Sequence, residues 1–289
     1  MNPRLLTIFI AVCDAPSLTA AAKALYLSQP AVSAAIRDLE ADLGVVLFER
    51  LNRRLILTPA GAQLADIARH VLRLTEDAKS AVMATHRASP LRIGSSITIG
   101  IKLLPELIAR YQARYPDVNV TVTVHTTERI TALVAQNALD LGLVEGQIPP
   151  APLVAVPFMR DDLVVIAPKD HPLRHAANVS LEALCAQALL MRDPASGTRQ
   201  LADAALLQHG FHVTPAWESI STLALVEAVK AGLGVAILPW RLVEEAINRG
   251  DVVRLNVPQL RLARDFLAIT HRDKYRSASL TAFLELLTP

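Results

Sequence analysis

Cysteine and net charge are scarce in this chain of 289 residues, and long apolar runs are missing. Its two cysteines, Cys13 and Cys185, have no C-x-x-C spacing, so the sequence predicts neither a zinc nor a dithiol site and favours a reducing cytosol. The formal net charge of +2 excludes an overall basic field, so any contact with nucleic acid must come from a local patch. No run approaches the ~20 apolar residues that cross a bilayer. Residues 5–12 are apolar but lack the processing site of a secretory leader, and we expect a cytoplasmic protein.

Common catalytic signatures are also missing. None of the eight histidines lies in an H-E-x-x-H motif, and no G-x-S-x-G nucleophile elbow occurs. Gly232 and Gly234 form only G-x-G, which falls short of a dinucleotide fingerprint and is equally explained by a glycine that ends a helix. We therefore expect no enzyme, no metal site and no cofactor.

What the chain does contain is ample material for cores, since 52% of its residues are hydrophobic. Its length fits a small domain joined to a larger, two-lobed unit. The spacing of apolar residues predicts short helices followed by a small β element over residues 1–58. It predicts one long helix over residues 59–87. Residues 88–90 break this helix as a hinge. Residues 91–289 form an α/β unit, with one lobe over about 91–161 and 266–289 and a second over about 162–265.

The predicted long helix carries an apolar stripe of Leu64, Ile67, Ala68, Val71, Leu74 and Ala78. Such a stripe must be buried, and no neighbouring segment obviously covers it. Pairing with the same helix of a second chain is the simplest solution. Packing within its own chain is the alternative.

Strands alternate with helices over residues 91–289. Candidate strands are 91–96, 119–126, 139–144, 162–168, 188–192, 235–239, 252–257 and 265–271, and candidate helices are 103–115, 129–137, 180–186, 199–209 and 222–231. Gly210 and Gly232 follow two of these helices as C-terminal stops. The alternation predicts parallel sheets covered on both faces, and about 200 residues suit two lobes with a ligand cleft between them.

Residues 17–44 have the spacing of two helices joined by a tight turn, which is typical of a helix-turn-helix. Ser17 is a candidate cap of the first helix, and Ser28 caps the second, with Pro30 among its first positions. The apolar faces are Ala20, Ala21, Ala24 and Leu25 on the first helix and Val32, Ile36 and Leu39 on the second. The second helix leaves Gln29, Ala31, Ser33, Ala34 and Arg37 free to meet base edges and phosphates.

The stretch from Phe9 to Gly61 resembles the winged helix-turn-helix of LysR-type transcriptional regulators. The matching positions are Phe9, Ala11, Val12, Ser17, Ala21, Ala22, Leu25, Ser28, Gln29, Pro30, Ala31, Val32, Ser33, Ile36, Leu39, Glu40, Leu43, Gly44, Leu47, Phe48, Arg50, Leu57, Thr58, Ala60 and Gly61. Pro16 departs from the pattern, because the family commonly has glycine there. We expect this change to alter the preceding turn without abolishing DNA binding.

The resemblance extends over nearly the whole chain. It implies that the α/β unit consists of two subdomains like those of periplasmic binding proteins, with an effector in the cleft between them. It also implies a homo-oligomer, a dimer or more usually a tetramer, that binds an inverted-repeat operator in double-stranded DNA and acts with RNA polymerase. The expected DNA-contacting residues are Ser28, Gln29, Pro30, Ser33 and Arg37 in the second helix and Arg50, Arg53 and Arg54 in the wing.

Two helix starts predict the effector site. Residues 93–100 and 192–199 each lead from a strand into a helix, and helix starts rich in hydroxyls with arginines nearby are natural anion receptors. The predicted site comprises Ser95, Ser96, Thr98, Glu145, Arg192, Ser196, Gly197, Thr198 and Thr222. Helix capping without a ligand is the alternative reading of the hydroxyl groups.

Glu145 complicates this prediction, because its carboxylate would repel an anion unless it pairs with Arg192 or binds an amine or a proton. Residues 95–100 and 196–199 look like those of the LysR subgroup with regulators of sulfur assimilation and carbon fixation. That resemblance favours a small, anionic effector. A solute-storage protein and a thiol-redox sensor are the other candidates, and the N-terminal motif opposes the first. Cys13 and Cys185 fall in different domains, which opposes an intrachain redox pair.

Overall fold

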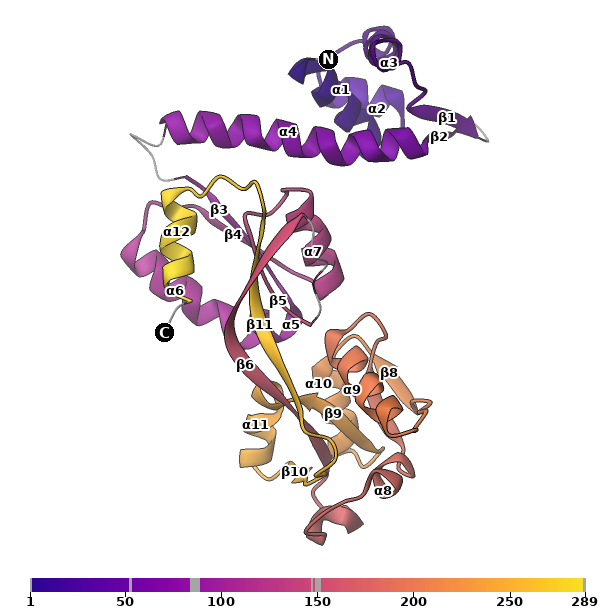
Figure 1. The fold of residues 1–289 in the computed structure, drawn as a ribbon, viewed down its shortest axis with the longest axis vertical. Helices are drawn as coiled ribbons and strands as arrows, with labels where there is room; N and C mark the ends of the chain where they lie inside the picture. Colours follow the sequence, from indigo (N-terminus) through magenta and orange to yellow (C-terminus); the bar gives the residue numbers. More distant parts are fainter. Residues whose placement is uncertain (1, 52–53, 84–88, 147, 149–151, 288–289) are drawn as a thin grey trace. The chain divides into compact units, whose positions relative to one another are not determined.

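The computed structural model describes residues 2–51, 54–83, 89–146, 148 and 152–287. The chain separates into two compact units. The first contains residues up to Ser89 with the short segments Ala135–Ala138 and Asp273–Ser277, and the second contains the rest. Each unit is described by itself (Figure 1). None of the described helices combines the length and apolar character that a bilayer-spanning segment requires.

The first unit has the predicted order of short helices followed by a small β element. Its elements are α1 (Pro3–Asp14), α2 (Leu18–Ala24), α3 (Gln29–Leu43), β1 (Phe48–Leu51), β2 (Arg54–Leu57) and α4 (Pro59–Met83). The two strands pair as an antiparallel hairpin. Phe9, Ala21, Val32, Leu39 and Leu47 are fully buried and form the centre of one core.

The predicted apolar face of α2 was partly wrong. Ala21 is buried as expected, but the second buried residue is Ala22, while Ala24 is exposed. Leu18 and Leu25 pack against the same core, so the stripe follows positions 18, 21, 22 and 25. A run of alanines gives no difference in hydrophobicity from which the phase of the helix could be read.

The structure shows how part of the apolar stripe of α4 is buried, for which the alternatives were a second chain and the chain itself. Leu64, Ala65 and Ala68 are buried in the core that α1 and α3 build, and Val71 packs against it, so this half of the stripe is covered within the chain. Ile67 of the stripe and Val82 in the last turn described remain 50% and 79% exposed. The helix is described as far as Met83, and the remainder of the predicted helix, together with Ala88 of the predicted hinge, lies outside the described residues.

The second unit is a nine-stranded mixed sheet with helices packed on it. Its strands are β3 (Leu91–Ser95), β4 (Val120–Val124), β5 (Leu141–Glu145), β6 (Leu153–Pro168), β7 (Leu189–Arg192), β8 (Trp217–Ser219), β9 (Val235–Pro239), β10 (Val252–Leu255) and β11 (Leu262–His271). Its helices are α5 (Ile97–Lys102), α6 (Leu104–Arg114), α7 (Thr127–Ala135), a 3-10 turn η1 (Pro172–His175), α8 (Leu181–Cys185), α9 (Gly197–Gln208), α10 (Thr222–Lys230), α11 (Trp240–Asn248) and α12 (Ala278–Glu285).

The prediction of parallel sheets holds within each lobe but not between the lobes. Strands β4, β3 and β5 are parallel in one lobe, and β8, β7 and β9 are parallel in the other. Strands β6, β10 and β11 are antiparallel to their neighbours. Strands β6 and β11 run from one lobe into the other in opposite directions, because the chain enters the second lobe along one and returns along the other (Figure 1).

Each lobe has its own apolar core. Leu91, Tyr111, Leu141, Phe266 and Phe283 belong to the core of the first lobe. The second lobe buries one cluster on each face of its sheet, which is typical of a parallel sheet covered on both sides. Strands β6 and β11 pair at Asp161 and Arg264, where the chain passes between the two lobes. The sequence analysis did not identify β8, α11, α12 or the first half of β6, whereas the predicted helix start after Ser96 is that of α5.

Gly210 and Gly232 end their helices as predicted. Both follow a C-cap residue and have positive φ angles, 80° and 81°, which glycine adopts without steric cost.

Candidate DNA interface and effector site

Caps at both starts fix the helix pair of the N-terminal unit. Ser17 Oγ accepts a hydrogen bond from the Ala20 N–H at 3.1 Å, and Ser28 Oγ accepts one from the Ala31 N–H at 3.4 Å. Pro30 occupies one of the first two positions of α3, where a missing N–H has little cost. Both predicted caps are confirmed, and α3 therefore begins at Gln29.

Three residues of the family pattern hold the hairpin against α3 and α4. Glu40 Oε1 accepts hydrogen bonds from the backbone N–H groups of Leu47 and Phe48, at 2.7 and 3.3 Å. Thr58 Oγ1 donates to the Val46 carbonyl at 2.8 Å and accepts from the Gly61 N–H at 2.9 Å. A Cβ at residue 61 would collide with the Leu47 carbonyl oxygen, so only glycine fits. The sequence pattern contained these residues but did not reveal what they do.

The polar face of α3 is open in the N-terminal unit. Gln29, Pro30 and Arg37 are exposed, and Ser33 is half-buried. Arg37 Nη1 donates to Ser33 Oγ at 3.4 Å, one helical turn away, so the guanidinium lies along this face. This face offers amide, hydroxyl and guanidinium groups with the chemistry that reads base edges and phosphates.

Arg50 and Arg54 lie on the two strands of the hairpin, opposite Leu55 and Leu51. Arg53, the third predicted wing residue, lies outside the described residues.

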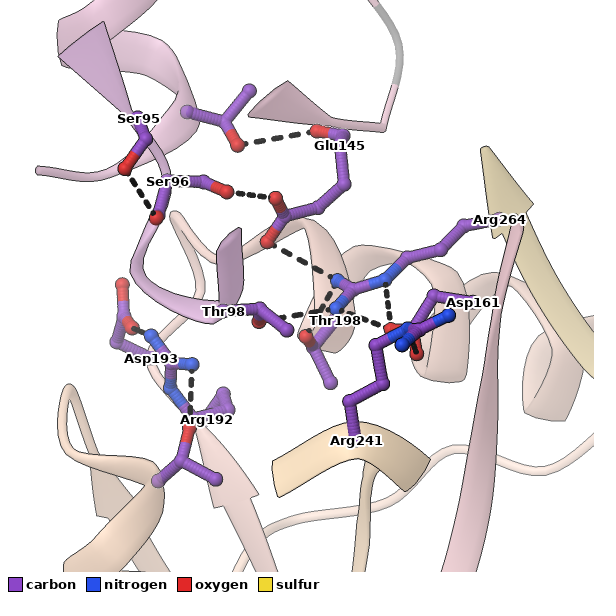
Figure 2. A network of polar contacts seen from close by, with 12 residues as sticks. Ser95, Ser96, Thr98, Glu145, Asp161, Arg192, Asp193, Thr198, Arg241 and Arg264 are labelled. Atoms are coloured by element: carbon purple, nitrogen blue, oxygen red, sulfur yellow. Dashed lines mark hydrogen bonds and ion pairs between the residues drawn. The ribbon is translucent and has the colours of Figure 1, made fainter. Parts of the chain in front are cut away.

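The second unit contains a buried polar cluster between its lobes, and Arg264 is at its centre (Figure 2). Arg264 is 7% exposed. Its guanidinium donates to Thr98 Oγ1 at 3.2 Å from the first lobe and to Thr198 Oγ1 at 3.0 Å from the second. It also pairs with Asp161 Oδ2 at 3.0 Å and with Glu145 Oε1 at 3.3 Å. One cation therefore contacts both predicted helix starts.

Glu145 is neutralised by a residue that the sequence analysis did not identify. Its carboxylate pairs with Arg264 and accepts a hydrogen bond from Ser96 Oγ, whereas Arg192 forms its ion pair with Asp193. Of the alternatives for Glu145, the structure therefore shows an arginine partner, but this partner is Arg264 and not Arg192. The signal was weak, because Arg264 lies about 120 residues downstream in a strand that otherwise reads as apolar.

Arg192 has its own set of partners in the second lobe. Its guanidinium donates to Thr222 Oγ1 at 2.9 Å and to the Ser219 carbonyl at 3.3 Å, and it pairs with Asp193 at 3.4 Å. These contacts fix the start of α10 against the end of β7. Arg192 and Thr222 are thus brought together as predicted, although by a direct hydrogen bond.

Asp161 is the least satisfied charge of the cluster. Its side chain is 1% exposed, and burial raises the pKa of this carboxyl group, which Arg264 and Arg241 oppose. Its Oδ1 atom has no hydrogen-bond partner in the described structure, and Arg241 Nε lies 3.8 Å away from it. The two carboxylates are thus balanced by two arginines, one of them at the edge of the cluster.

The start of α9 faces the same cluster. Ser196 is buried, but its hydroxyl does not cap the helix, which leaves the first N–H groups of α9 without a side-chain acceptor. Gly197 lies beside Glu145, since a Cβ on residue 197 would be 3.4 Å from the Glu145 carbonyl oxygen. Ser96 likewise does not cap α5, and Ser95 Oγ donates to the Ser96 carbonyl. Capping therefore does not explain the hydroxyl groups of Ser96 and Ser196.

Neither cysteine has the environment of a reactive thiol. Burial raises the pKa of Cys13 to about 11 and also raises the pKa of Cys185. Both thiols are free. A raised pKa suppresses the nucleophilic thiolate, which argues against the thiol-sensor alternative.

Two family models match this chain. Residues 3–62 match the bacterial regulatory helix-turn-helix protein, LysR family, and residues 84–289 match the LysR substrate binding domain.

Individual relatives agree with both matches. The chain is 35% identical to the uncharacterized HTH-type transcriptional regulator YeiE of Escherichia coli K12, over 99% of this chain and 97% of that protein. It is 32% identical to the RuBisCO operon transcriptional regulator of Allochromatium vinosum, over 98% and 94%, which agrees with the predicted likeness to carbon-fixation regulators. These relatives are named as regulators and not as enzymes.

Among solved structures, the CcmR regulatory domain of Synechocystis PCC6803 in complex with 2-PG is 27% identical, with a TM-score of 0.65 over 69% of this chain and 95% of that one. The matches, the capped helix pair with its hairpin and the two-lobed α/β unit agree. The chain belongs to the LysR family of DNA-binding transcriptional regulators, and its C-terminal unit is the effector-binding domain of that family.

Proposed function

We propose that this regulator reads an inverted-repeat operator with α3 in the major groove. Ser28, Gln29, Pro30, Ser33 and Arg37 would contact bases and phosphates there. The support for α3 is its exposed polar face, which begins at a capped end and carries an arginine. Arg50, Arg53 and Arg54 would contact the backbone or the minor groove from the hairpin.

Two reading heads require two chains, so the regulator would act as a dimer or a tetramer. The exposed Ile67 and Val82 on α4 offer apolar surface for such pairing. RNA polymerase is the expected downstream partner, and the cytoplasm the expected compartment.

We further propose that a small anion is the effector and that it binds between the lobes. The observation that carries this proposal is the buried guanidinium of Arg264, which donates to Thr98 from one lobe and to Thr198 from the other. An anion could take the place of the Glu145 carboxylate on Ser96 and Arg264, with the free N–H groups of α9 as further donors. Ser95, Arg192 and Thr222 would support these contacts from both sides.

Effector binding would then act through the arrangement of the lobes. When the anion displaces Glu145, the contact of Glu145 with Arg264 is lost and the anion makes contacts in its place. The anion then favours whichever arrangement of the lobes binds it more tightly. If that arrangement also changes the spacing of the DNA-reading heads, affinity for effector and for one operator geometry are linked.

Calorimetric titration of the full-length protein with sulfite, sulfate, phosphate and sugar phosphates tests this proposal. Saturable binding of one of them should be weakened at least about tenfold in Thr98→Val and in Thr198→Val, because each valine removes a hydroxyl and keeps the shape. Thr121→Val, at an exposed position of β4, is the matched control and should bind as the wild type. Tight binding of only a neutral or cationic compound would overturn the anionic effector.

A further inference from the structure

A polar pocket opens in the second lobe, and its lining does not include Arg264. Its volume is about 390 Å³, which is in the range of small-molecule sites. Three arginines, Arg160, Arg254 and Arg261, line it, together with one carboxylate, Asp162. The lining therefore carries three positive charges and one negative charge.

The pocket arises from the way the chain leaves and rejoins the sheet. Strand β10 ends with Leu255 opposite Val165 of β6, and β11 begins with Leu262 opposite Leu163. Both strands pair with the edge of β6 that is opposite β9, because β9 pairs with the same residues of β6. Five of the six intervening residues line the pocket, namely Asn256, Val257, Pro258, Leu260 and Arg261.

Strand register gathers three of the charges on one face. Arg160 and Asp162 are two residues apart on β6, so their side chains share a face. Arg254 is opposite Ile166, which lies four residues beyond Asp162 and shares that face too. The Arg254 guanidinium lies over the Trp240 ring, 5.6 Å from its centroid, so this cation is held in place by a ring contact.

These three arginines differ from the other arginines of the second lobe. Arg174, Arg192, Arg199, Arg241, Arg249 and Arg264 each have a carboxylate within 4.0 Å. In the part of the chain that the structure describes, Arg160, Arg254 and Arg261 have none. Three guanidinium groups at one pocket repel one another, and an anion between them relieves this repulsion.

We propose that this pocket is a second binding site, for a small metabolite that carries phosphate groups. Guanidinium groups bind phosphate oxygens through paired hydrogen bonds, and three of them match a di- or polyanion better than a single carboxylate. Pro258 and the sheet backbone provide surface for the organic part of the ligand. The site is separate from the effector site proposed above.

The position of the pocket also couples it to the lobes. Asp161 lies between Arg160 and Asp162 in sequence, and Arg264 follows Ala263, which lines the pocket. Because side chains alternate along a strand, Asp161 and Arg264 point to the opposite face of the same two strands. The pocket and the Arg264 cluster therefore share the same stretch of β6 and β11, and we expect a ligand in one site to change affinity at the other.

Calorimetric titration of the full-length protein with pyrophosphate tests the proposal. We expect saturable binding that Arg254→Gln/Arg261→Gln weakens at least about tenfold and that Asp162→Asn strengthens severalfold. A gain in affinity cannot arise from misfolding, so D162N supports the site even if the double variant unfolds. Arg114→Gln is the matched control, because Arg114 is also exposed and lies 5.5 Å from the ring centroid of Tyr115, but in the first lobe.

The same titration separates the two sites. The Thr98→Val/Thr198→Val variant should keep its pyrophosphate affinity at this pocket, whatever it does to the effector. If pyrophosphate binding is lost in that variant and kept in R254Q/R261Q, the ligand lies in the cleft and the second site is overturned. The proposal is also overturned if wild-type protein shows no saturable binding up to about 10 mM pyrophosphate.

Discussion

Arg264 and Asp161 are cross-strand partners at the point where β11 and β6 pass from one lobe to the other, and their side chains form a buried ion pair at 3.0 Å. A change in the angle between the lobes would have to bend β6 and β11, and the ion pair lies at the place where this bend would occur. Through Glu145, Thr98 and Thr198, Arg264 also connects both helix starts of the proposed effector site. One side chain therefore joins the crossing strands to the site.

Replacing Arg264 with methionine should destabilise the effector domain by about 3–5 kcal/mol, because Asp161 and Glu145 would be left buried without their partner. Urea unfolding followed by tryptophan fluorescence measures this change, since Trp217 and Trp240 both lie in that domain. Arg241→Met is the control. Arg241 is 36% exposed and 3.8 Å from Asp161, so its loss should cost less than about 1 kcal/mol.

The triple variant Arg264→Met/Asp161→Asn/Glu145→Gln should recover much of that loss, because it removes the buried charges together. Equal stability of R264M and R241M would contradict the central role of Arg264.

Glu40→Ala should destabilise the N-terminal unit by about 1.5–3 kcal/mol, because the backbone N–H groups of Leu47 and Phe48 lose a charged acceptor. Glu40→Gln retains an oxygen at the same place and should lose clearly less. Hydrogen exchange of the Leu47 and Phe48 amides reports the change locally. If both variants exchange at the wild-type rate, Glu40 does not hold the hairpin.

Arg37→Ala should weaken binding to the intergenic DNA beside the gene by about 1–3 kcal/mol without changing the unfolding transition. The reason is the loss of the guanidinium from the exposed face of α3. A gel-shift titration at fixed salt gives the measurement. Arg4→Ala, an exposed arginine on α1, is the control, and an unchanged affinity for R37A would remove α3 from the DNA interface.

Cys13 should react slowly with iodoacetamide. In a Cys185→Ser background at pH 8, the thiolate fraction of a group with a pKa of about 11 is about a hundredfold lower than that of an ordinary cysteine. The rate should therefore rise steeply with pH up to about 11. In urea the same thiol should titrate near its ordinary value. Since the folded state favours the neutral thiol, its contribution to stability is lost as pH rises from the unfolded pKa to the folded one. A native-state midpoint near 9 would show that burial does not raise this pKa.

Elements whose signals are local could be predicted from the amino-acid sequence. Interactions among a few neighbouring residues decide where a helix is capped, where a glycine ends it and where β-branched residues form a strand. Ser17, Ser28 and Gly210 are examples that were therefore predictable. The order of polar and apolar residues from Phe9 to Gly61 was sufficient to recognise the DNA-binding unit. The hydroxyl groups of Thr98 and Thr198 were predicted to share a site because helix starts meet at the edge of a sheet.

Contacts between distant segments could not be predicted, because they depend on how the chain folds back on itself. Arg264 became the partner of Glu145 because β11 returns along β6 and places residue 264 opposite residue 161, and no local pattern encodes that register. The same return leaves Arg160, Arg254 and Arg261 around one pocket, although they are spread over about 100 residues. The phase of α2 was also decided by packing, since alanines of equal hydrophobicity give no preference until another helix covers one side. Local interactions determine where helices and strands form, whereas the pairing of strands that are distant in sequence determines which charged side chains come together.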